Sequence, residues 1–427
     1  MRKYNVSIEL SGKQVPVGLL QQEDDSDTAV FKYLDSYREL SHVCPVSISL
    51  PLQKEAFPAE QTRCFFDGLL PEGFTRRSVA QWMHASENDY MKLLYGLGRE
   101  CLGALRISAP EDIPEASYEK LDIEEVRKLA AEGAEKSAEI MVESHLSLTG
   151  ASGKVGLYYD RKSDSWYLPR GSAPSTHIVK QSHVRLSGIV VNEQLALKTA
   201  ERCGLEVPSC FIVNVGNGAD ADILLASERY DRILSPDSNI IGELPAPFRL
   251  HQEDFAQALG ITSGEKYEKN GRRHMASMFQ LLREYSQDPI SDQQKLWDII
   301  VFHWLIGNTD GHIKNFSLLY SPDMRSIHLA PAYDIVSTAI YPSCTREMAF
   351  SIGGDTDLDR IDRNSFRRAA HEVGISEKMA LSRFDRLGNT FADALEKSAE
   401  ELADAGFAGC EDIKKKILQN GGCRQLL

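Results

Sequence analysis

The sequence lacks the paired cysteines, long hydrophobic runs and basic excess that mark several classes of protein. Its eight cysteines are scattered and form no CxxC pair, so we predict reduced thiols rather than a zinc or redox site. The longest apolar stretch, residues 299–306, is interrupted by His303 and falls far short of the ~20 residues that span a bilayer. The N-terminus alternates polar and apolar side chains, unlike the continuous apolar run of a signal peptide. These absences predict a soluble cytoplasmic protein with no membrane partner.

Basic side chains are scarce relative to acidic ones. Lys and Arg total 48 against 62 Asp and Glu, which gives a formal net charge of −14. A field of that sign repels a phosphate backbone unless a basic patch is segregated, so we expect any contact with nucleic acid to be indirect. The hydrophobic fraction of 42% and the charged fraction of 26% are typical of globular proteins, and 427 residues are enough for two or three domains.

The first part of the chain, residues 1–140, is predicted to form a mixed α/β subdomain. Apolar residues alternate over residues 4–10, and a Ser-Gly-Lys turn leads back to residues 15–17, which indicates a hairpin. A glycine-bounded apolar run over residues 98–107 resembles another strand. Residues 119–139 are rich in Ala, Glu, Lys and Leu, which predicts a solvated helix that serves as a surface spacer.

A second subdomain, residues 141–232, is predicted to be a sheet that carries one helix. The helix is expected from about Glu193, with Asn192 as its N-cap and Gly204 just beyond its end. The strand-like segments are residues 154–159, 166–168, 176–180, 211–215 and 222–226.

The rest of the chain, residues 233–427, is predicted to be a mostly α-helical lobe. Apolar residues recur at helical spacing over much of it, for example at Leu381, Phe384 and Leu387. The exception is a hairpin expected over residues 316–329.

Three oxygen-bearing side chains follow the apolar helix that ends near Leu305. Asp310 and Asn315 lie on one glycine-bearing polar loop, and Asp334 follows after a further strand. Phosphoryl transfer needs a carboxylate that orients the attacking hydroxyl, and an amide oxygen and a second carboxylate that hold Mg²⁺. Turn formation and surface pairing would account for the same residues, because polar loop residues usually serve turns.

Two further features help to distinguish a phosphoryl-transfer site from ordinary turn residues. Lys180 ends a strand and Glu193 begins the next helix, which matches the ion pair of protein kinases, although an ordinary surface lysine has the same pattern. Residues 147–154 form a glycine-rich turn ahead of that strand, suited either to a phosphate-covering loop or to a hairpin turn. The turn is not a Walker A motif, because Leu148 and Val155 replace required residues.

The end of the sheet, residues 226–231, stands where a kinase hinge would bind adenine through its backbone, although a solvated strand end fits equally well. His312 lies in the polar loop, where it either contacts a phosphate or, as is more usual for a loop histidine, bonds to backbone groups. The histidines show no metal-binding spacing.

In this order, these segments resemble the HipA family of bacterial serine/threonine kinases, the toxins of HipBA-type toxin–antitoxin pairs. The resemblance covers almost the whole chain. Its two most specific motifs are residues 305–317, Leu-Ile-Gly-Asn-Thr-Asp-Gly-His-Ile-Lys-Asn-Phe-Ser, and Tyr-Asp-Ile at 333–335. Other matching segments are residues 66–73, 98–105, 147–151, 176–180, 192–193, 228–231, 249–254 and 266–268.

The resemblance implies an α+β, kinase-like bilobal fold, with a mixed α/β N-terminal region, an ATP-binding sheet in residues 141–232 and a mostly α-helical C-terminal lobe. It implies ATP and Mg²⁺ as cofactors, Asp310 as the catalytic carboxylate, and Asn315 and Asp334 as metal ligands. The residues it places at the nucleotide are Thr149, Gly150, Ala151, Ser152, Gly153, Lys154, Lys180, Glu228, Arg229, Tyr230, His312, Lys314 and Tyr333.

The resemblance also implies autophosphorylation at Ser147, a protein substrate such as an aminoacyl-tRNA synthetase, and a HipB-like helix-turn-helix antitoxin that would supply any contact with DNA. Two other functions stay open. One is a kinase-like scaffold or corepressor that binds the antitoxin without catalysis, and the other is a small-molecule phosphotransferase that keeps the same site. An acidic chain that reaches DNA through a basic partner fits the first of these.

Overall fold

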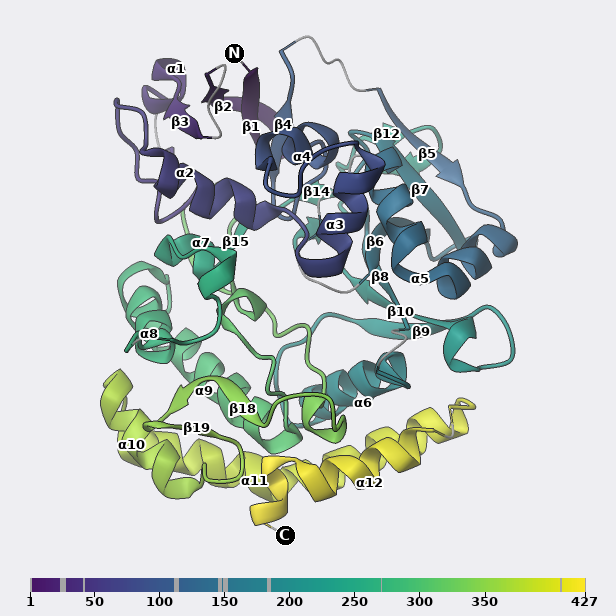
Figure 1. The fold of residues 1–427 in the computed structure, drawn as a ribbon, viewed down its shortest axis with the longest axis vertical. Helices are drawn as coiled ribbons and strands as arrows, with labels where there is room; N and C mark the ends of the chain where they lie inside the picture. Colours follow the sequence, from purple (N-terminus) through teal and green to yellow (C-terminus); the bar gives the residue numbers. More distant parts are fainter. Residues whose placement is uncertain are drawn as a thin grey trace.

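The computed structural model describes residues 2–23, 28–40, 43–110, 115–144, 148, 153–182, 186–269, 271–407 and 409–426 (Figure 1). The two larger antiparallel sheets occupy the upper part and the middle right of the view, and a group of long helices forms the lower part. The fold is mixed α+β, as the sequence predicts. None of the helices in these ranges is long and apolar enough to cross a membrane.

The first sheet has four strands in the order β3-β2-β1-β4. Tyr4, Val6 and Ile8 alternate along one face of β1 and are buried, as expected for a strand that covers a core on one side. The predicted hairpin is confirmed, with a turn at Ser11-Gly12. The strands are β1 (Arg2–Leu10), β2 (Lys13–Gln22), β3 (Ala29–Tyr33) and β4 (Leu105–Ser108), and the helices of this region are α1 (Asp35–Arg38), α2 (Ala59–Phe66), α3 (Gly73–Trp82) and α4 (Tyr90–Leu97).

The second sheet has six strands in the order β5-β7-β6-β8-β10-β9, all antiparallel. It confirms the five predicted strand segments with ends shifted by at most three residues, and it adds a strand that the sequence analysis missed. The strands are β5 (Ala116–Lys120), β6 (Lys154–Asp160), β7 (Ser165–Gly171), β8 (His177–Gln181), β9 (Cys210–Asn214) and β10 (Ile223–Glu228).

The helix predicted as a surface spacer instead covers one face of this sheet. It is α5 (Ile123–Ser144), and its buried residues Val126, Leu129 and Ala130 belong to the same hydrophobic cluster as residues of β6, β7, β8 and β10. Glu124 and Glu125 in the first turn are exposed, and acidic residues of this kind are why composition alone suggested full solvation. The predicted boundary at residue 140 falls inside α5, and β5 pairs with β7 of the second sheet.

The opposite face of the sheet is covered by α6 (Ile189–Arg202), which begins earlier than predicted. Asn192 is not its N-cap. The helix starts after Gly188, whose φ of 71° suits glycine, and the Asn192 amide exchanges hydrogen bonds of 3.0 Å with the Ser337 backbone. Glu193 therefore lies in the second turn rather than the first. The glycine predicted beyond the helix, Gly204, is confirmed with a φ of 85°.

The C-terminal lobe is mostly helical, as predicted. Its central helix α9 (Pro289–Ile306) is buried on all sides from Leu296 onward, and α11 (Glu377–Asp404) packs Leu381, Phe384 and Leu387 into the core. The other helices are α7 (Phe255–Leu259), α8 (His274–Tyr285), α10 (Arg363–Val373) and α12 (Cys410–Asn420).

The expected hairpin in this lobe is confirmed as β16 (Ser317–Tyr320) and β17 (Ile327–Leu329), and β15 (Gln252–Asp254) pairs with β16. Three small two-stranded ribbons were not predicted, because strands of two to six residues carry little periodic signal. They pair β11 (Arg232–Ile233) with β14 (Phe248–Arg249), β12 (Ile240–Ile241) with β13 (Leu244–Pro245), and β18 (Glu347–Ile352) with β19 (Asp355–Asp357).

Candidate active site

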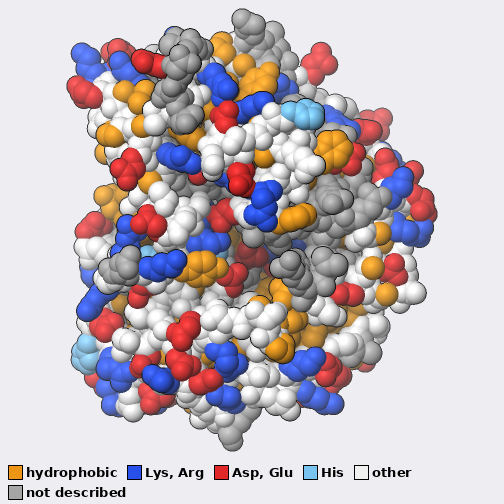
Figure 2. Space-filling view, viewed as in Figure 1, with side chains coloured by type: hydrophobic (Ala, Val, Ile, Leu, Met, Phe, Trp, Pro, Cys, Tyr) orange, Lys and Arg blue, Asp and Glu red, His pale blue; other side chains and the backbone are white. Residues whose placement is uncertain are grey.

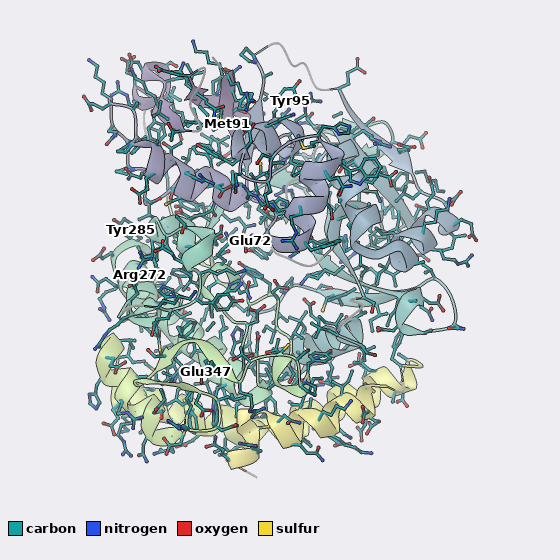
Figure 3. The ribbon with its side chains drawn as sticks, in the orientation of Figure 1. Glu72, Met91, Tyr95, Arg272, Tyr285 and Glu347 are labelled. Atoms are coloured by element: carbon teal, nitrogen blue, oxygen red, sulfur yellow. The ribbon has the colours of Figure 1, made fainter. Side chains whose placement is uncertain are left out.

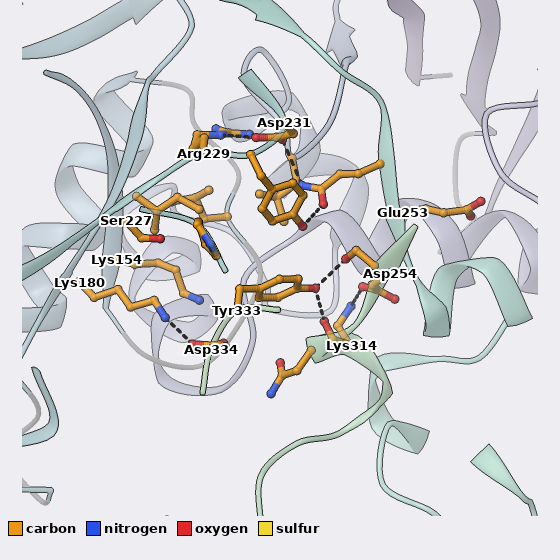
Figure 4. Close-up of a pocket in the computed structure, with 18 of the residues that line it drawn as sticks. Lys154, Lys180, Ser227, Arg229, Asp231, Glu253, Asp254, Lys314, Tyr333 and Asp334 are labelled. Carbon is orange, nitrogen blue, oxygen red and sulfur yellow. Dashed lines mark hydrogen bonds and ion pairs between the residues drawn. The ribbon is translucent and has the colours of Figure 1, made fainter. Parts of the chain in front are cut away.

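A pocket opens between the second sheet and the C-terminal lobe, and this face of the molecule is hollowed there (Figure 2). Glu72, from the first subdomain, lies at the same boundary (Figure 3). The pocket holds about 970 Å³ of empty space, part of it open to solvent. The residues predicted from sequence that line it are Lys154, Lys180, Glu228, Arg229, Tyr230, His312, Lys314, Asn315, Tyr333 and Asp334 (Figure 4).

Lys180 links the sheet to α6 and to the segment that follows β17. On β8 it lies on the face that α6 covers, and its ammonium contacts Glu193 Oε1 at 2.5 Å and Asp334 Oδ1. Burial alone would lower the pKa of Lys180, but the Asp334 and Glu193 carboxylates outweigh that effect and hold the pKa above its ordinary value. The lysine is therefore a fixed cation at the floor of the pocket.

Lys154 stands directly opposite Lys180 on the neighbouring strand β6. Its side chain is buried and lines the pocket, and within the described residues no group accepts a hydrogen bond from its ammonium. Burial lowers the pKa of Lys154 and the Lys180 charge adds to this, while Asp334 opposes it. Two adjacent ammonium groups repel each other, so the pair is suited to an anionic ligand.

Asp310 is not one of the residues that line the pocket. It lies at the rim, on the loop that follows α9, where it bonds to the lining residue Asn315. Gly307, with a φ of 74°, ends the helix and turns the chain into this loop. The Asp310 side chain is exposed, its Oδ1 accepts a hydrogen bond from the Tyr267 hydroxyl, and its carbonyl accepts one from the Asn315 amide at 2.9 Å. Desolvation in the cleft raises the pKa of Asp310, with the Asp334 and Glu72 charges adding to it against Tyr267 and Lys266.

Asn315 and Asp334 supply oxygen donors that fit Mg²⁺. The Asn315 amide donates through its nitrogen, which leaves its oxygen available. Burial opposes ionisation of Asp334, but Lys180 and Lys154 hold its pKa well below the usual range, so it stays a carboxylate. No group of three His, Cys, Asp or Glu side chains in the described parts of the chain forms a metal cage. Such a donor pair suits Mg²⁺, which commonly takes one or two protein oxygens and completes its shell with phosphates and water.

Asp334 also has an unusual backbone. Its φ of 57° lies in the left-handed region that favours glycine, which costs a non-glycine residue about 1–3 kcal/mol. Such strain is concentrated at functional sites, where the surrounding structure holds it.

The hinge residues Glu228, Arg229 and Tyr230 differ in what they can offer a ligand. The Glu228 N–H donates to the Ser209 carbonyl at 2.8 Å, and the Arg229 N–H donates to the Thr176 carbonyl at 2.9 Å. In the described structure the Tyr230 N–H has no acceptor. Tyr230 is therefore the hinge residue whose backbone donor is open to a base.

Arg229 and Lys314 are held by the protein itself. The Arg229 guanidinium is buried and pairs with Asp231 at 2.8 Å and with Glu100 at 3.3 Å. The Lys314 ammonium donates to Asp254 at 2.7 Å and to the Gly68 carbonyl at 3.2 Å. Both side chains therefore brace the pocket, and neither has a free charge to offer a ligand.

His312 and Tyr333 form part of the pocket wall. His312 is buried, and burial lowers its pKa to about 3, so the ring stays neutral. Its Nδ1 has no hydrogen-bond partner in the described structure. The Tyr333 hydroxyl donates to the Lys314 carbonyl at 3.0 Å, and its ring stacks on Tyr230 with centroids 5.7 Å apart. The stacked Tyr230 and Tyr333 rings form an aromatic wall of the pocket beside the hinge.

The predicted phosphate-covering loop falls largely outside the described residues. Ser147 and Thr149, Gly150, Ala151 and Ser152 all belong to that part. Gly153 is buried next to the start of β6, and Leu148 lines the pocket.

Sequence reasoning missed two residues next to Asp310. Glu72 forms an ion pair with Lys266 at 2.7 Å, and the Tyr267 hydroxyl donates a hydrogen bond to Asp310. Both sit in segments that carried only the family resemblance. Glu72 and Lys266 are separated by 194 positions, so no local spacing would have connected them.

The HipA N-terminal domain family matches residues 8–108, and the HipA-like C-terminal domain family matches residues 146–395. A putative kinase of Sinorhizobium fredii, Y4mE, is 32% identical over 397 residues, covering 91% of this chain and 90% of the relative. The serine/threonine-protein kinase toxin HipA of Shewanella oneidensis is 26% identical over 403 residues, covering 91% and 88%.

A solved structure has the same fold. A chain in the complex of Shewanella oneidensis HipA, HipB and operator DNA superposes with a TM-score of 0.81 at 24% identity, covering 98% of this chain and 97% of that one. The kinase-like bilobal arrangement expected from the sequence is therefore confirmed. With family matches in both halves and a relative this similar over nine-tenths of its length, the chain belongs to the HipA family.

Proposed function

We propose that this chain is an ATP- and Mg²⁺-dependent serine/threonine protein kinase that acts as a toxin by phosphorylating a cytosolic protein. The observation that carries the proposal is the convergence of Lys180, Glu193 and Asp334 in one pocket, with Asn315 beside them and Asp310 at the rim. A kinase active site has these components: a lysine on a strand, a glutamate on the next helix, and a set of two aspartates and an asparagine.

ATP would occupy the pocket with its base toward the hinge. The open N–H of Tyr230 would donate to adenine, and apolar side chains of Leu102, Ile178 and Leu197 would contact the ring. Lys180 and Lys154 would neutralise phosphate charge. The loop from Thr149 to Lys154 would close over the phosphates, and His312, Lys314 and Tyr333 would shape the pocket wall.

Asp310 would accept a hydrogen bond from the acceptor hydroxyl and orient it for attack on the terminal phosphoryl group. Its place at the rim leaves it open to a protein substrate, while the nucleotide residues lie deeper. Asn315 and Asp334 would hold Mg²⁺, and the ion would supply charge neutralisation on the phosphates.

A HipB-like helix-turn-helix antitoxin is the proposed partner, and contact with nucleic acid would come only through it. The structural relative comes from a complex that contains HipB and operator DNA, and the net charge of −14 disfavours direct binding to DNA.

We also propose a cytoplasmic location, autophosphorylation at Ser147, and the division of the chain into residues 1–140, 141–232 and 233–427. A phosphate dianion on Ser147 would not fit a loop that closes over ATP phosphates.

The test is transfer of labelled phosphate from ATP by the parent and by Asp310→Asn, with Mg²⁺ present and the products mapped by mass spectrometry. We expect the parent to modify itself and Asp310→Asn to bind ATP without transfer. Equal transfer by both proteins would refute the role of Asp310. ATP binding without any protein phosphorylation would favour a small-molecule phosphotransferase, and absence of ATP binding would favour a scaffold that binds the antitoxin.

A further inference from the structure

Residues 266–268, a Lys-Tyr-Glu segment between the helices α7 and α8, cross the rim of the pocket beside Asp310. All three side chains are engaged, and each points to a different part of the molecule. Lys266 pairs with Glu72 of the first subdomain at 2.7 Å. Tyr267 donates to Asp310. Glu268 faces the C-terminal lobe.

Glu268 anchors the segment to the C-terminal lobe through four hydrogen bonds. One carboxylate oxygen accepts from the Ser351 N–H at 3.1 Å and from its hydroxyl at 2.5 Å. The other accepts from the His274 N–H at 2.8 Å, at the start of α8. The backbone N–H of Glu268 donates to the Ala349 carbonyl at 2.8 Å. The segment is therefore fixed on this side by a strand and a helix.

Glu72 holds the other side of the segment. Its side chain is 13% exposed and precedes α3, and it also lies 3.7 Å from the Lys314 ammonium. The Lys266 ammonium lies 5.5 Å from the centroid of the Tyr267 ring, and that ring meets His312 edge to face at 5.2 Å. The Tyr267 ring is thus held between the Lys266 ammonium and the His312 ring.

The Tyr267 hydroxyl occupies one oxygen of the Asp310 carboxylate. A carboxylate has two oxygens that accept hydrogen bonds, and no group in the described parts of the chain bonds Oδ2. A fixed donor on Oδ1 removes rotational freedom from the side chain and leaves Oδ2 as the acceptor for a hydroxyl.

We propose that Tyr267 is a positioning residue for phosphoryl transfer, which holds the Asp310 carboxylate through its Oδ1 so that Oδ2 meets the acceptor hydroxyl. Glu72 and Glu268 set the place of Tyr267 by anchoring its two neighbours. This role rests on the proposed kinase function. It gives the first subdomain, through Glu72, a part in the chemistry of a site built by the other two.

The test compares the full-length parent, Tyr267→Phe and the control Tyr285→Phe, which removes the hydroxyl of an exposed tyrosine on α8. The readouts are phosphate transfer from labelled ATP to the chain itself at saturating ATP and Mg²⁺, and the apparent KM for ATP. Loss of a hydrogen bond to a charged group predicts a fall in kcat of about ten- to hundredfold for Tyr267→Phe. KM for ATP stays within about twofold, because the nucleotide residues are untouched, and Tyr285→Phe matches the parent.

Hydrogen exchange of the peptide over residues 307–316 provides a readout that does not depend on activity. Tyr267→Phe should exchange faster there than the parent, and Tyr285→Phe should not. Glu72→Gln should lower kcat in the same direction but by less, whereas Glu265→Gln, whose partner Arg272 is also at the surface, should leave it unchanged.

An active parent with unchanged kcat in Tyr267→Phe would overturn the inference and leave the proposed function standing. A parallel rise in KM for ATP would do the same, because it would mark a general structural role. A parent without phosphate transfer would overturn both. Unchanged exchange over residues 307–316 would contradict the claim that Tyr267 holds this loop.

Discussion

The Lys180 ammonium lies between the Glu193 and Asp334 carboxylates, which come from α6 and from the segment after β17. The Lys180 side chain is 12% exposed and Glu193 is 7% exposed, so this is a nearly buried ion pair that joins the sheet to a helix and to the proposed metal site. Removing one partner of a buried pair leaves an uncompensated charge, which costs more than the pair itself contributes.

Lys180→Met should therefore weaken both nucleotide binding and the fold. We expect the Kd for ATP·Mg to rise about ten- to hundredfold and the free energy of unfolding to fall by about 3 kcal/mol, because Glu193 loses its cation. Calorimetry and denaturant titration measure the two effects. The control is Lys198→Met, which removes a partly exposed lysine from α6. Unchanged ATP affinity in Lys180→Met would contradict the placement of the phosphates.

Asp334→Asn should separate metal binding from nucleotide binding. The substitution keeps the size of the side chain but removes the charge that suits Mg²⁺. In the parent we expect ATP affinity to depend on Mg²⁺, and in Asp334→Asn this dependence should be lost. Titration of ATP with and without Mg²⁺ measures it. An unaltered dependence on Mg²⁺ would exclude Asp334 as a ligand.

Glu100 should be one of the most sensitive positions for stability. It is fully buried in the first subdomain and accepts hydrogen bonds from Arg229 at 3.3 Å, Arg232 at 2.8 Å and Arg249 at 2.6 Å. Glu100→Gln should lower the free energy of unfolding by about 3–5 kcal/mol. Glu119→Gln, at a surface ion pair, should cost under about 1 kcal/mol. Similar losses at the two positions would show that the buried cluster is not a determinant of stability.

Acid should destabilise the protein through His303. Burial lowers the pKa of His303 to about 4, so the folded state keeps the ring neutral while the unfolded chain takes up a proton below about pH 6.5. This contribution to stability is complete above pH 6.5 and is lost as the pH falls toward 4, at about 1.4 kcal/mol per pH unit. His303→Met should reduce the slope of the free energy of unfolding against pH by that amount, as measured in denaturant titrations between pH 4.5 and 6.5. The control is His371→Met, which changes an exposed histidine. An unchanged slope in His303→Met would contradict a neutral buried ring.

Local signals in the sequence were enough to predict the hairpin at the N-terminus, five strands of the second sheet and the glycine after α6. In each case the information lies within a few residues, as alternation along a strand or a glycine with positive φ. The start of α6 was missed because Ile189, Val190 and Val191 are β-branched and favour strands, and tertiary packing overrides that preference. The sheet-covering role of α5 was hidden by acidic residues such as the exposed Glu124 and Glu125.

The proposed site likewise combines residues that are close in sequence with contacts between residues that are far apart in sequence. Asp310 and Asn315 are close in sequence, so their spacing on one loop pointed to the chemistry before the fold was known. The contacts that hold them are long-range. Tyr267 is 43 positions from Asp310, and Glu72 is 194 positions from Lys266, so only the folded chain brings these residues together.

The most direct test of the central claim is a crystal structure with Mg²⁺ and a non-hydrolysable ATP analogue. The account predicts the nucleotide in the pocket, with its base at Tyr230, its phosphates beside Lys180 and Lys154, and the metal ion on Asn315 and Asp334. A nucleotide bound elsewhere, or a metal ion held by other residues, would contradict it.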